Sequence, residues 1–188
     1  MGRYRLIDLG IWLVILAVFE AVAVNAAVRF TGQPYWVSVV PALCAIVMMR
    51  WGAWAGIHAL VGGLVTCLAA GAGTRMCLIY GAGNLMGLAA LLLIKLFGKE
   101  KLRGDALKSL LFAFTVFVLM QSGKALMSLA FGEAPKQTIG LFAPEVVSLL
   151  FTLILIWIAR RLDGVFEDQK KYVARVQKEQ EKERGDSL

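Results

Sequence analysis

Residues 6–28 read LIDLGIWLVILAVFEAVAVNAAV, an apolar run long enough to cross a lipid bilayer as a helix. A helix that spans the hydrocarbon core needs about 20 predominantly apolar residues. The whole chain of 188 residues agrees, because 59% of them are hydrophobic and the mean hydropathy is +0.71. Soluble domains are only roughly 45–50% apolar. The sequence therefore predicts a polytopic membrane protein. No small-residue cleavage site ends the first run, so we expect it to be retained and not removed as a signal peptide.

Five further apolar runs follow and predict an all-α membrane protein, a six-transmembrane-helix bundle. The second run is short and contains Pro41, and the third and fourth are rich in glycine. Glycines four residues apart, as in Gly52/Gly56 and Gly83/Gly87, allow helix backbones to approach closely in lipid. The further runs cover about 37–50, 53–73, 76–97, 108–131 and 145–162.

The distribution of lysine and arginine predicts the orientation of the bundle. One set of helix ends carries most of the basic residues, and such ends face the cytoplasm. Both termini are therefore expected in the cytoplasm, with residues 1–162 as the transmembrane domain and 163–188 as a charged cytoplasmic tail. The basic set is Arg3, Arg5, Arg50, Lys99, Lys101, Arg103, Lys108, Arg160 and Arg161, and the opposite set is Arg29, Arg75 and Lys136.

The tail mixes charges of both signs and has a thin apolar stripe at Val165, Phe166, Val173 and Val176. Two interpretations are open. It can be a solvated helix that continues from the last span, or a helix that docks onto a partner. It is not a strongly basic arm, so we expect no nucleic-acid partner.

Polar residues inside the spans predict a ligand pocket. Ionisable groups are costly in a bilayer, so they usually face a cavity or pair with one another. A rise of about 1.5 Å per residue places the candidates in the outer half of the bundle, on several helices. The alternative is that each snorkels or pairs at the interface. An excess of basic groups favours an anionic or amide-rich ligand. The candidate substrate-binding residues are Asn25, Arg29, Trp36, Arg75, Tyr80, Asn84, Gln121, Lys124 and Glu145.

Two ionisable residues lie outside this candidate pocket. Glu20 is about 13 Å below Arg29 along the first helix, too deep to reach the surface comfortably. It can be protonated, or it can pair with a group on the fifth helix such as Lys124. His58 stands alone on an apolar face, and we interpret it as a packing residue.

Catalytic and metal-binding motifs are absent from the sequence. It contains no HExxH, GxSxG or GK[ST] motif and no paired catalytic carboxylates, so we expect a protein that is not an enzyme and needs no cofactor. Cys44, Cys67 and Cys77 form no CxxC pair and are interpreted as free thiols, without a metal site. The chain also lacks the repeated halves of a self-sufficient secondary transporter.

The short second span with its proline, and the segments VPALCAIVMMRWGAWAGIHALVGGLV (40–65) and YGAGNLMGLAALLL (80–93), resemble the substrate-binding S components of energy-coupling factor (ECF) vitamin transporters. The resemblance covers roughly residues 6–162. It implies a high-affinity vitamin-binding subunit in a bacterial cell membrane. Its partners would be a transmembrane coupling subunit and, through it, two cytoplasmic ATPases. Cobalamin, pantothenate and a folate-like vitamin are all compatible ligands.

In that family an AxxxA motif on the first helix docks the coupling subunit. Ala17 and Ala21 match its spacing here, and Ala23 and Ala27 form a second match. Small residues one turn apart make a shallow groove that a partner helix can enter. The resemblance thus implies a partner interface on these alanines.

Two other classes of protein stay open. A structural or assembly scaffold would pair its outer polar residues with one another and leave no cavity. An intramembrane enzyme or stand-alone carrier would need an ionisable relay that reaches the inner half, which only Asp8, Glu20 and His58 could supply.

Overall fold

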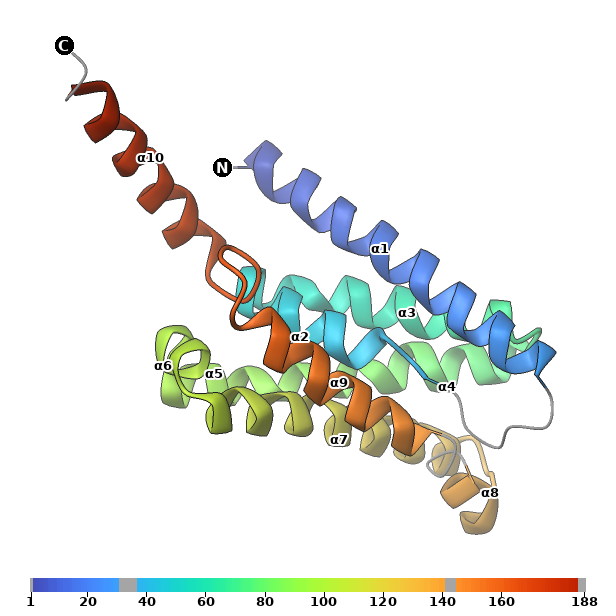
Figure 1. The fold of residues 1–188 in the computed structure, drawn as a ribbon. Coiled ribbons are helices and arrows are strands. Elements are labelled where there is room, and N and C mark those ends of the chain that lie inside the picture. The colour runs from blue at the N-terminus through green and yellow to red at the C-terminus, as the bar shows by residue number, and fades with distance from the viewer. Residues whose placement is uncertain (1, 31–36, 141–144, 186–188) are drawn as a thin grey trace.

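The computed structural model describes residues 2–30, 37–140 and 145–185, and every regular element in these ranges is a helix (Figure 1). This confirms the all-helical prediction. The apolar runs predicted from the sequence coincide with single helices or with two or three consecutive helices. The elements are α1 (Gly2–Arg29), α2 (Val40–Trp51), η1 (Gly52–Trp54), α3 (Ala55–Ala69), α4 (Thr74–Asn84), η2 (Leu85–Ala90), α5 (Leu91–Phe97), α6 (Lys99–Gly104), α7 (Ala106–Ala130), α8 (Pro135–Gly140), α9 (Val146–Ala159) and α10 (Gln169–Gly185).

Four helical stretches in the described ranges are long and apolar enough to cross a membrane. They are Gly2–Arg29, Val40–Ala69, Thr74–Phe97 and Ala106–Ala130, and the shorter apolar helix Val146–Ala159 follows them. The second stretch consists of α2 and α3, which pack against each other on either side of η1. Gly52, with φ of 65°, lies at the junction between them. At 12 residues, α2 rises only about 18 Å, less than a bilayer core of about 30 Å.

Helix α2 forms the centre of the bundle. All 12 of its residues are buried, including Pro41 in its first turn, where a proline costs no helical hydrogen bond. It packs against α1, α3, α7 and α9. A helix that is apolar all round is stable only when neighbours surround it. The short proline-containing run is therefore an enclosed core helix.

Glycines bring α4 close to both of its neighbours. A Cβ atom on Gly123 of α7 would collide with the carbonyl oxygen of Gly83, and one on Gly63 of α3 would lie 2.5 Å from the backbone of Tyr80. Gly83 lies against the backbone of Lys124, as the four-residue glycine spacing predicted, whereas Gly87 packs against the side chain of Met120. Gly52 differs from this expectation, because a Cβ there would meet nothing within 4 Å.

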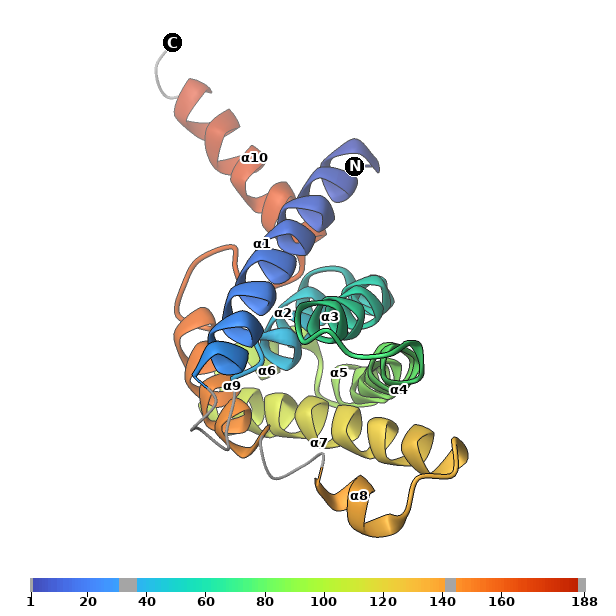
Figure 2. The same ribbon diagram turned by 90° about the vertical axis from the view of Figure 1, so that its right-hand side faces the viewer.

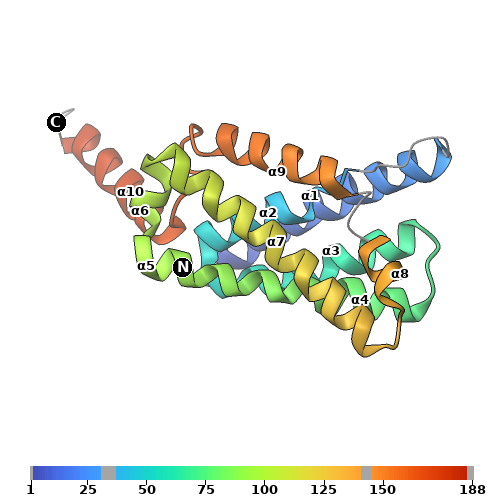
Figure 3. The ribbon, with the colours of Figure 1, turned by 90° about the horizontal axis from the view of Figure 1, so that it is seen from below.

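Charged residues gather at the end of the bundle where α6 and the last turn of α9 lie, which we call the basic end. Figure 3 shows α6 and α10 at this end and α8 at the other. The basic end carries Arg50 at the end of α2 and Arg160 after α9. Its placement in the cytoplasm stays a prediction.

The last span does not continue into the tail as one helix. Helix α9 ends at Ala159, and α10 begins at Gln169 after a turn that contains Gly164 with φ of 71°. Phe166 in this turn is fully buried, with its ring 6.4 Å from that of Phe112. Helix α10 then projects away from the bundle (Figures 1 and 2). The expectation that the tail continues from the last span as one helix is wrong, because Phe166 anchors a turn between them in the core, while most of α10 is exposed as a solvated helix would be.

Candidate functional site

A cluster of polar side chains is buried at the end of the bundle opposite the basic end. We call Tyr80, Gln121, Lys124 and Glu145 the Lys124 cluster. The Lys124 ammonium lies 2.6 and 2.7 Å from the two Glu145 carboxylate oxygens. Gln121 Nε2 also donates to that carboxylate, and the ammonium sits 4.7 Å from the centre of the Tyr80 ring. All four side chains are buried, so α4, α7 and the residue before α9 enclose a charged group.

Three helices, α4, α7 and α9, bring the Lys124 cluster together. Gln121 and Lys124 are three residues apart on α7, so they point to the same face of that helix. The contact of Gly83 with the Lys124 backbone seats α4 directly against α7. Glu145 is the N-cap residue of α9, which places its carboxylate near the positive end of the helix.

Only one end of the Gln121 side-chain amide makes a hydrogen bond to a described residue. Its Nε2 group must face the Glu145 carboxylate, because an amide oxygen there would meet another acceptor. Its Oε1 atom is then buried without a hydrogen-bond partner among the described residues. A buried acceptor without a partner is costly, which favours a donor arriving from outside the chain.

A second buried cluster surrounds Glu20. Its carboxylate accepts from Ser38 Oγ at 3.0 and 3.1 Å, from the Val39 amide at 2.8 Å and from Thr66 Oγ1 at 2.7 Å. The Ser38 amide donates to Ser148 Oγ at 2.9 Å. We call Glu20, Ser38 and Thr66 the Glu20 cluster. The hypothesis that Glu20 pairs with Lys124 is wrong, because Lys124 is engaged by Glu145.

The remaining sequence candidates lie outside the Lys124 cluster. Asn84 is buried and donates to the Ala59 carbonyl at 3.2 Å, which joins α4 to α3. Asn25 is exposed and bonds its own helix at Ala21, and Arg29 is exposed as well. Arg75 is exposed and pairs with Glu133 at 3.1 Å. Trp36 lies outside the described residues.

The alanines proposed as a partner surface lie on α1 at the border of its exposed face. Ala17, Ala21, Ala23 and Ala27 are all half-buried. Beside them stands a set of exposed apolar residues that suit lipid or a partner helix. This exposed set is Val14, Val18, Phe19, Val22 and Val28.

At the basic end, a buried arginine ties the tail turn to α1 and α2. Arg50 Nε donates to Asp8 at 3.0 Å, and the Trp51 indole donates to the same carboxylate at 2.6 Å. The Arg50 guanidinium also donates to the carbonyl of Val165 at 3.1 Å and to that of Gly164. The sequence analysis did not identify this site. The signal that could have pointed to it is an arginine at the end of an otherwise apolar helix.

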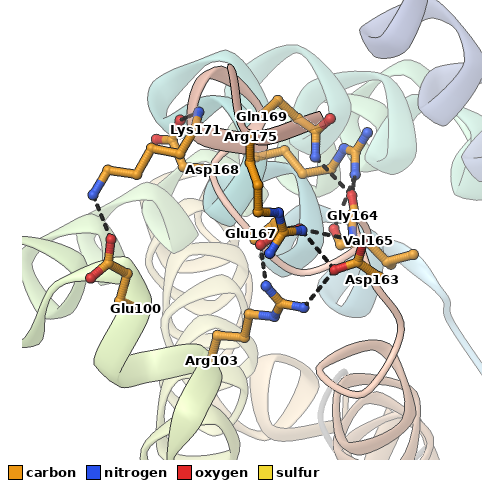
Figure 4. Close-up of polar contacts among 11 residues, drawn as sticks. Glu100, Arg103, Asp163, Gly164, Val165, Glu167, Asp168, Gln169, Lys171 and Arg175 are labelled. Atoms are coloured by element: carbon orange, nitrogen blue, oxygen red, sulfur yellow. Dashed lines mark hydrogen bonds and ion pairs between the residues drawn. The ribbon is translucent and has the colours of Figure 1, made fainter. Parts of the chain in front are cut away.

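Ion pairs then hold the start of α10 against α6 (Figure 4). Arg103 pairs with Glu167, and with Asp163 at 3.2 Å. Arg175 reaches Asp163 at 2.8 Å, and its hydrogen bond is the main cause that lowers the pKa of Asp163. Lys171 lies 2.6 Å from Glu100 and lowers the pKa of that carboxyl too. An open hollow of about 930 Å³ separates these elements, and its lining includes Ile94, Phe97, Lys99, Arg103, Lys171 and Tyr172.

The described residues contain no group of three or more His, Cys, Asp or Glu side chains able to hold a metal ion. Cys44, Cys67 and Cys77 are free thiols, as expected. His58 is buried, with Nε2 3.1 Å from the Leu9 carbonyl, which fits a packing role. Comparisons with protein-family models, with curated proteins and with solved structures find no match for this chain.

Proposed function

We propose that this chain is the substrate-binding S component of an ECF-type vitamin importer. It would lie in a bacterial cell membrane with six spans and both termini in the cytoplasm. The observation that carries the proposal is the Lys124 cluster. Charged side chains buried among apolar helices are costly, and they are most often retained where they serve a ligand or a transport path.

The pairing in the Lys124 cluster supports an anionic or amide-rich ligand. Glu145 presents a carboxylate to Lys124 and Gln121, in the same way that the carboxylate of a bound molecule would. An entering anion can take over these donors when Glu145 moves aside at the start of α9. The free Gln121 Oε1 atom would accept a hydrogen bond from an N–H or O–H group of the same ligand. Pantothenate, a folate-like vitamin and cobalamin all carry suitable groups.

The proposal assigns ATP hydrolysis to partner subunits, so this chain itself is not an enzyme. The exposed apolar face of α1 with Ala17, Ala21, Ala23 and Ala27 is the surface for the coupling subunit. Through that subunit, two ATPases would drive the release of vitamin into the cell. The bilayer would cover the remaining apolar surface.

Ligand binding is tested on the purified chain. Mass spectrometry identifies any vitamin that co-elutes, and isothermal titration then measures the affinity for a vitamin panel. We expect one vitamin to bind with a sub-micromolar Kd, which corresponds to more than about 8 kcal/mol of binding free energy. If no vitamin in the panel binds this tightly, the S-component proposal fails.

Docking of the coupling subunit is tested separately from binding. Replacement of Ala17 and Ala21 by tryptophan fills the shallow groove on α1. Vitamin binding should survive, while vitamin uptake with the coupling subunit should be lost. Ile7→Trp and Ile11→Trp, at exposed positions with the same four-residue spacing nearer the start of α1, serve as the matched control. Normal uptake by the alanine variant would refute this interface.

A structural or assembly scaffold is the second candidate function. The observation that favours it is the complete pairing of Lys124 with Glu145, since a scaffold would need its polar groups satisfied internally. The two functions predict opposite results in the titration. A scaffold binds no vitamin, and replacement of Lys124 lowers only its stability.

A further inference from the structure

Unlike Glu145, which lies against Lys124, Glu20 has no cation among its hydrogen-bond partners within the described part of the chain. The side chain is completely buried in the bundle, with 0% of its surface exposed. Its contacts come from two hydroxyl groups and one backbone amide, all of them neutral. An isolated carboxylate in such a site is far more costly than a neutral acid of the same shape. Among the described residues, the titratable groups that interact with it electrostatically are Glu145, the Cys44 thiol and the Tyr80 hydroxyl, and none of these is a cation.

Thr66 makes two short polar contacts with a single hydroxyl group. Thr66 Oγ1 lies 2.7 Å from Glu20 Oε1 and 2.9 Å from the carbonyl oxygen of Gly62. A hydroxyl group has one hydrogen to donate. If Glu20 is ionised, both neighbours are acceptors, and the one hydroxyl hydrogen has to be shared between them, which weakens both bonds.

A proton on Glu20 Oε1 supplies a hydrogen for the contact with Thr66. The acid then donates to Thr66 Oγ1, and the Thr66 hydroxyl donates onward to the Gly62 carbonyl. The other oxygen, Oε2, still accepts from the Val39 amide at 2.8 Å and from Ser38 Oγ at 3.1 Å. Both Thr66 contacts then have one donor and one acceptor, and the single hydrogen of Ser38 faces the two Glu20 oxygens at 3.0 and 3.1 Å.

We propose that Glu20 is a proton-binding site that carries its proton at neutral pH and passes a hydrogen bond through Thr66 to the Gly62 carbonyl. The site joins α1 to α3 and to the segment that enters α2, and Ser38 extends it to α9 through Ser148. Loss of the proton leaves a buried negative charge between α1 and α3. Release of the proton therefore requires α1 to move from α3 or water to enter, so proton binding and the packing of α1 are coupled.

Infrared spectroscopy of the protein in lipid nanodiscs tests this directly. A protonated carboxyl group has a C=O stretching band that is separate from the carboxylate bands and shifts to lower frequency in D2O. We expect such a band at pH 7 in the wild type. Glu20→Gln should remove it, and Glu100→Gln, which changes an exposed glutamate, should leave it in place. A carboxylate band lost in Glu20→Gln, with no carboxyl band lost, would overturn the proposal.

A second variant keeps the proposal testable if Glu20→Gln fails to fold. Thr66→Val removes the acceptor of the acid proton and leaves Glu20 in place. Because the hydrogen bond to the acid proton is lost, the carboxyl band should move to higher frequency. An ionised Glu20 has no such band, so a spectrum in which Thr66→Val changes only carboxylate bands contradicts the proton site.

Discussion

The ion pair between Lys124 and Glu145 gives the sharpest stability prediction. Its side chains are only 5% and 2% exposed, and the ammonium lies 2.6 Å from the nearer carboxylate oxygen. Removing one partner of a buried pair costs about 3–5 kcal/mol, because the other charge stays buried and unpaired. In a protein of 150–250 residues, 1 kcal/mol shifts Tm by about 2–4 °C. The variant Lys124→Met should therefore melt roughly 6–20 °C below the wild type.

A double-mutant cycle measured by thermal unfolding in detergent separates the pair from its surroundings. The double variant Lys124→Met, Glu145→Gln has no buried charge at this position, so it should recover much of the loss. Lys101→Met, at an exposed lysine of α6, should leave Tm unchanged. The reasoning is refuted if Lys124→Met melts within about 2 °C of the wild type, or if the two single losses simply add in the double variant.

Three further predictions concern packing, the tail and pH. Gly123→Ala should destabilise by about 1–3 kcal/mol in a thermal melt, because its Cβ meets the Gly83 carbonyl, whereas Gly10→Ala, with open space around it, should not. Phe166→Ala should cost about 3–5 kcal/mol and expose the start of α10 to limited proteolysis, whereas Leu162→Ala, half exposed, should do neither. Burial raises the pKa of Asp168, but its ion pair with Lys99 lowers it overall, and the Arg175 hydrogen bond lowers the pKa of Asp163. A lowered carboxyl pKa stabilises the fold above the ordinary value of 3.8, and the effect is lost as the pH falls below it. The protection factors of residues 163–175, which compare hydrogen exchange with the intrinsic rate at each pH, should therefore fall at acid pH. Equal protection factors at pH 7 and at acid pH, intact tails in Phe166→Ala, or equal melting of the two glycine variants would each contradict the corresponding prediction.

The helices could be predicted because each apolar run has the length and composition of a buried or membrane-spanning helix. The Lys124 cluster was also within reach of the sequence. A constant rise per residue placed Tyr80, Gln121, Lys124 and Glu145 at matching depths on different helices. Depth alone does not give the rotation of a helix about its axis. For this reason Asn25 and Arg75, at comparable depth, were grouped with residues that the structure places elsewhere.

The partners of Glu20 and Arg50 could not be predicted because most of them are short polar side chains or backbone groups. Ser38 lies in the chain before α2, and a lone serine there carries no recognisable signal. Arg50 binds the carbonyls of Gly164 and Val165, which every residue type has. The tail turn was missed for a related reason, since the apolar stripe that contains Phe166 does not show whether it packs against a partner or against the core of its own chain.

The affinity of the purified chain for its vitamin, measured by isothermal titration with Lys124 intact and replaced, tests the central claim most directly. The proposal predicts sub-micromolar binding by the wild type and by Lys101→Gln. It predicts binding at least about tenfold weaker in Lys124→Gln, a loss of about 1.4 kcal/mol or more. A folded wild-type protein that binds no vitamin in the panel, or a folded Lys124→Gln variant that binds as tightly as the wild type, would contradict it.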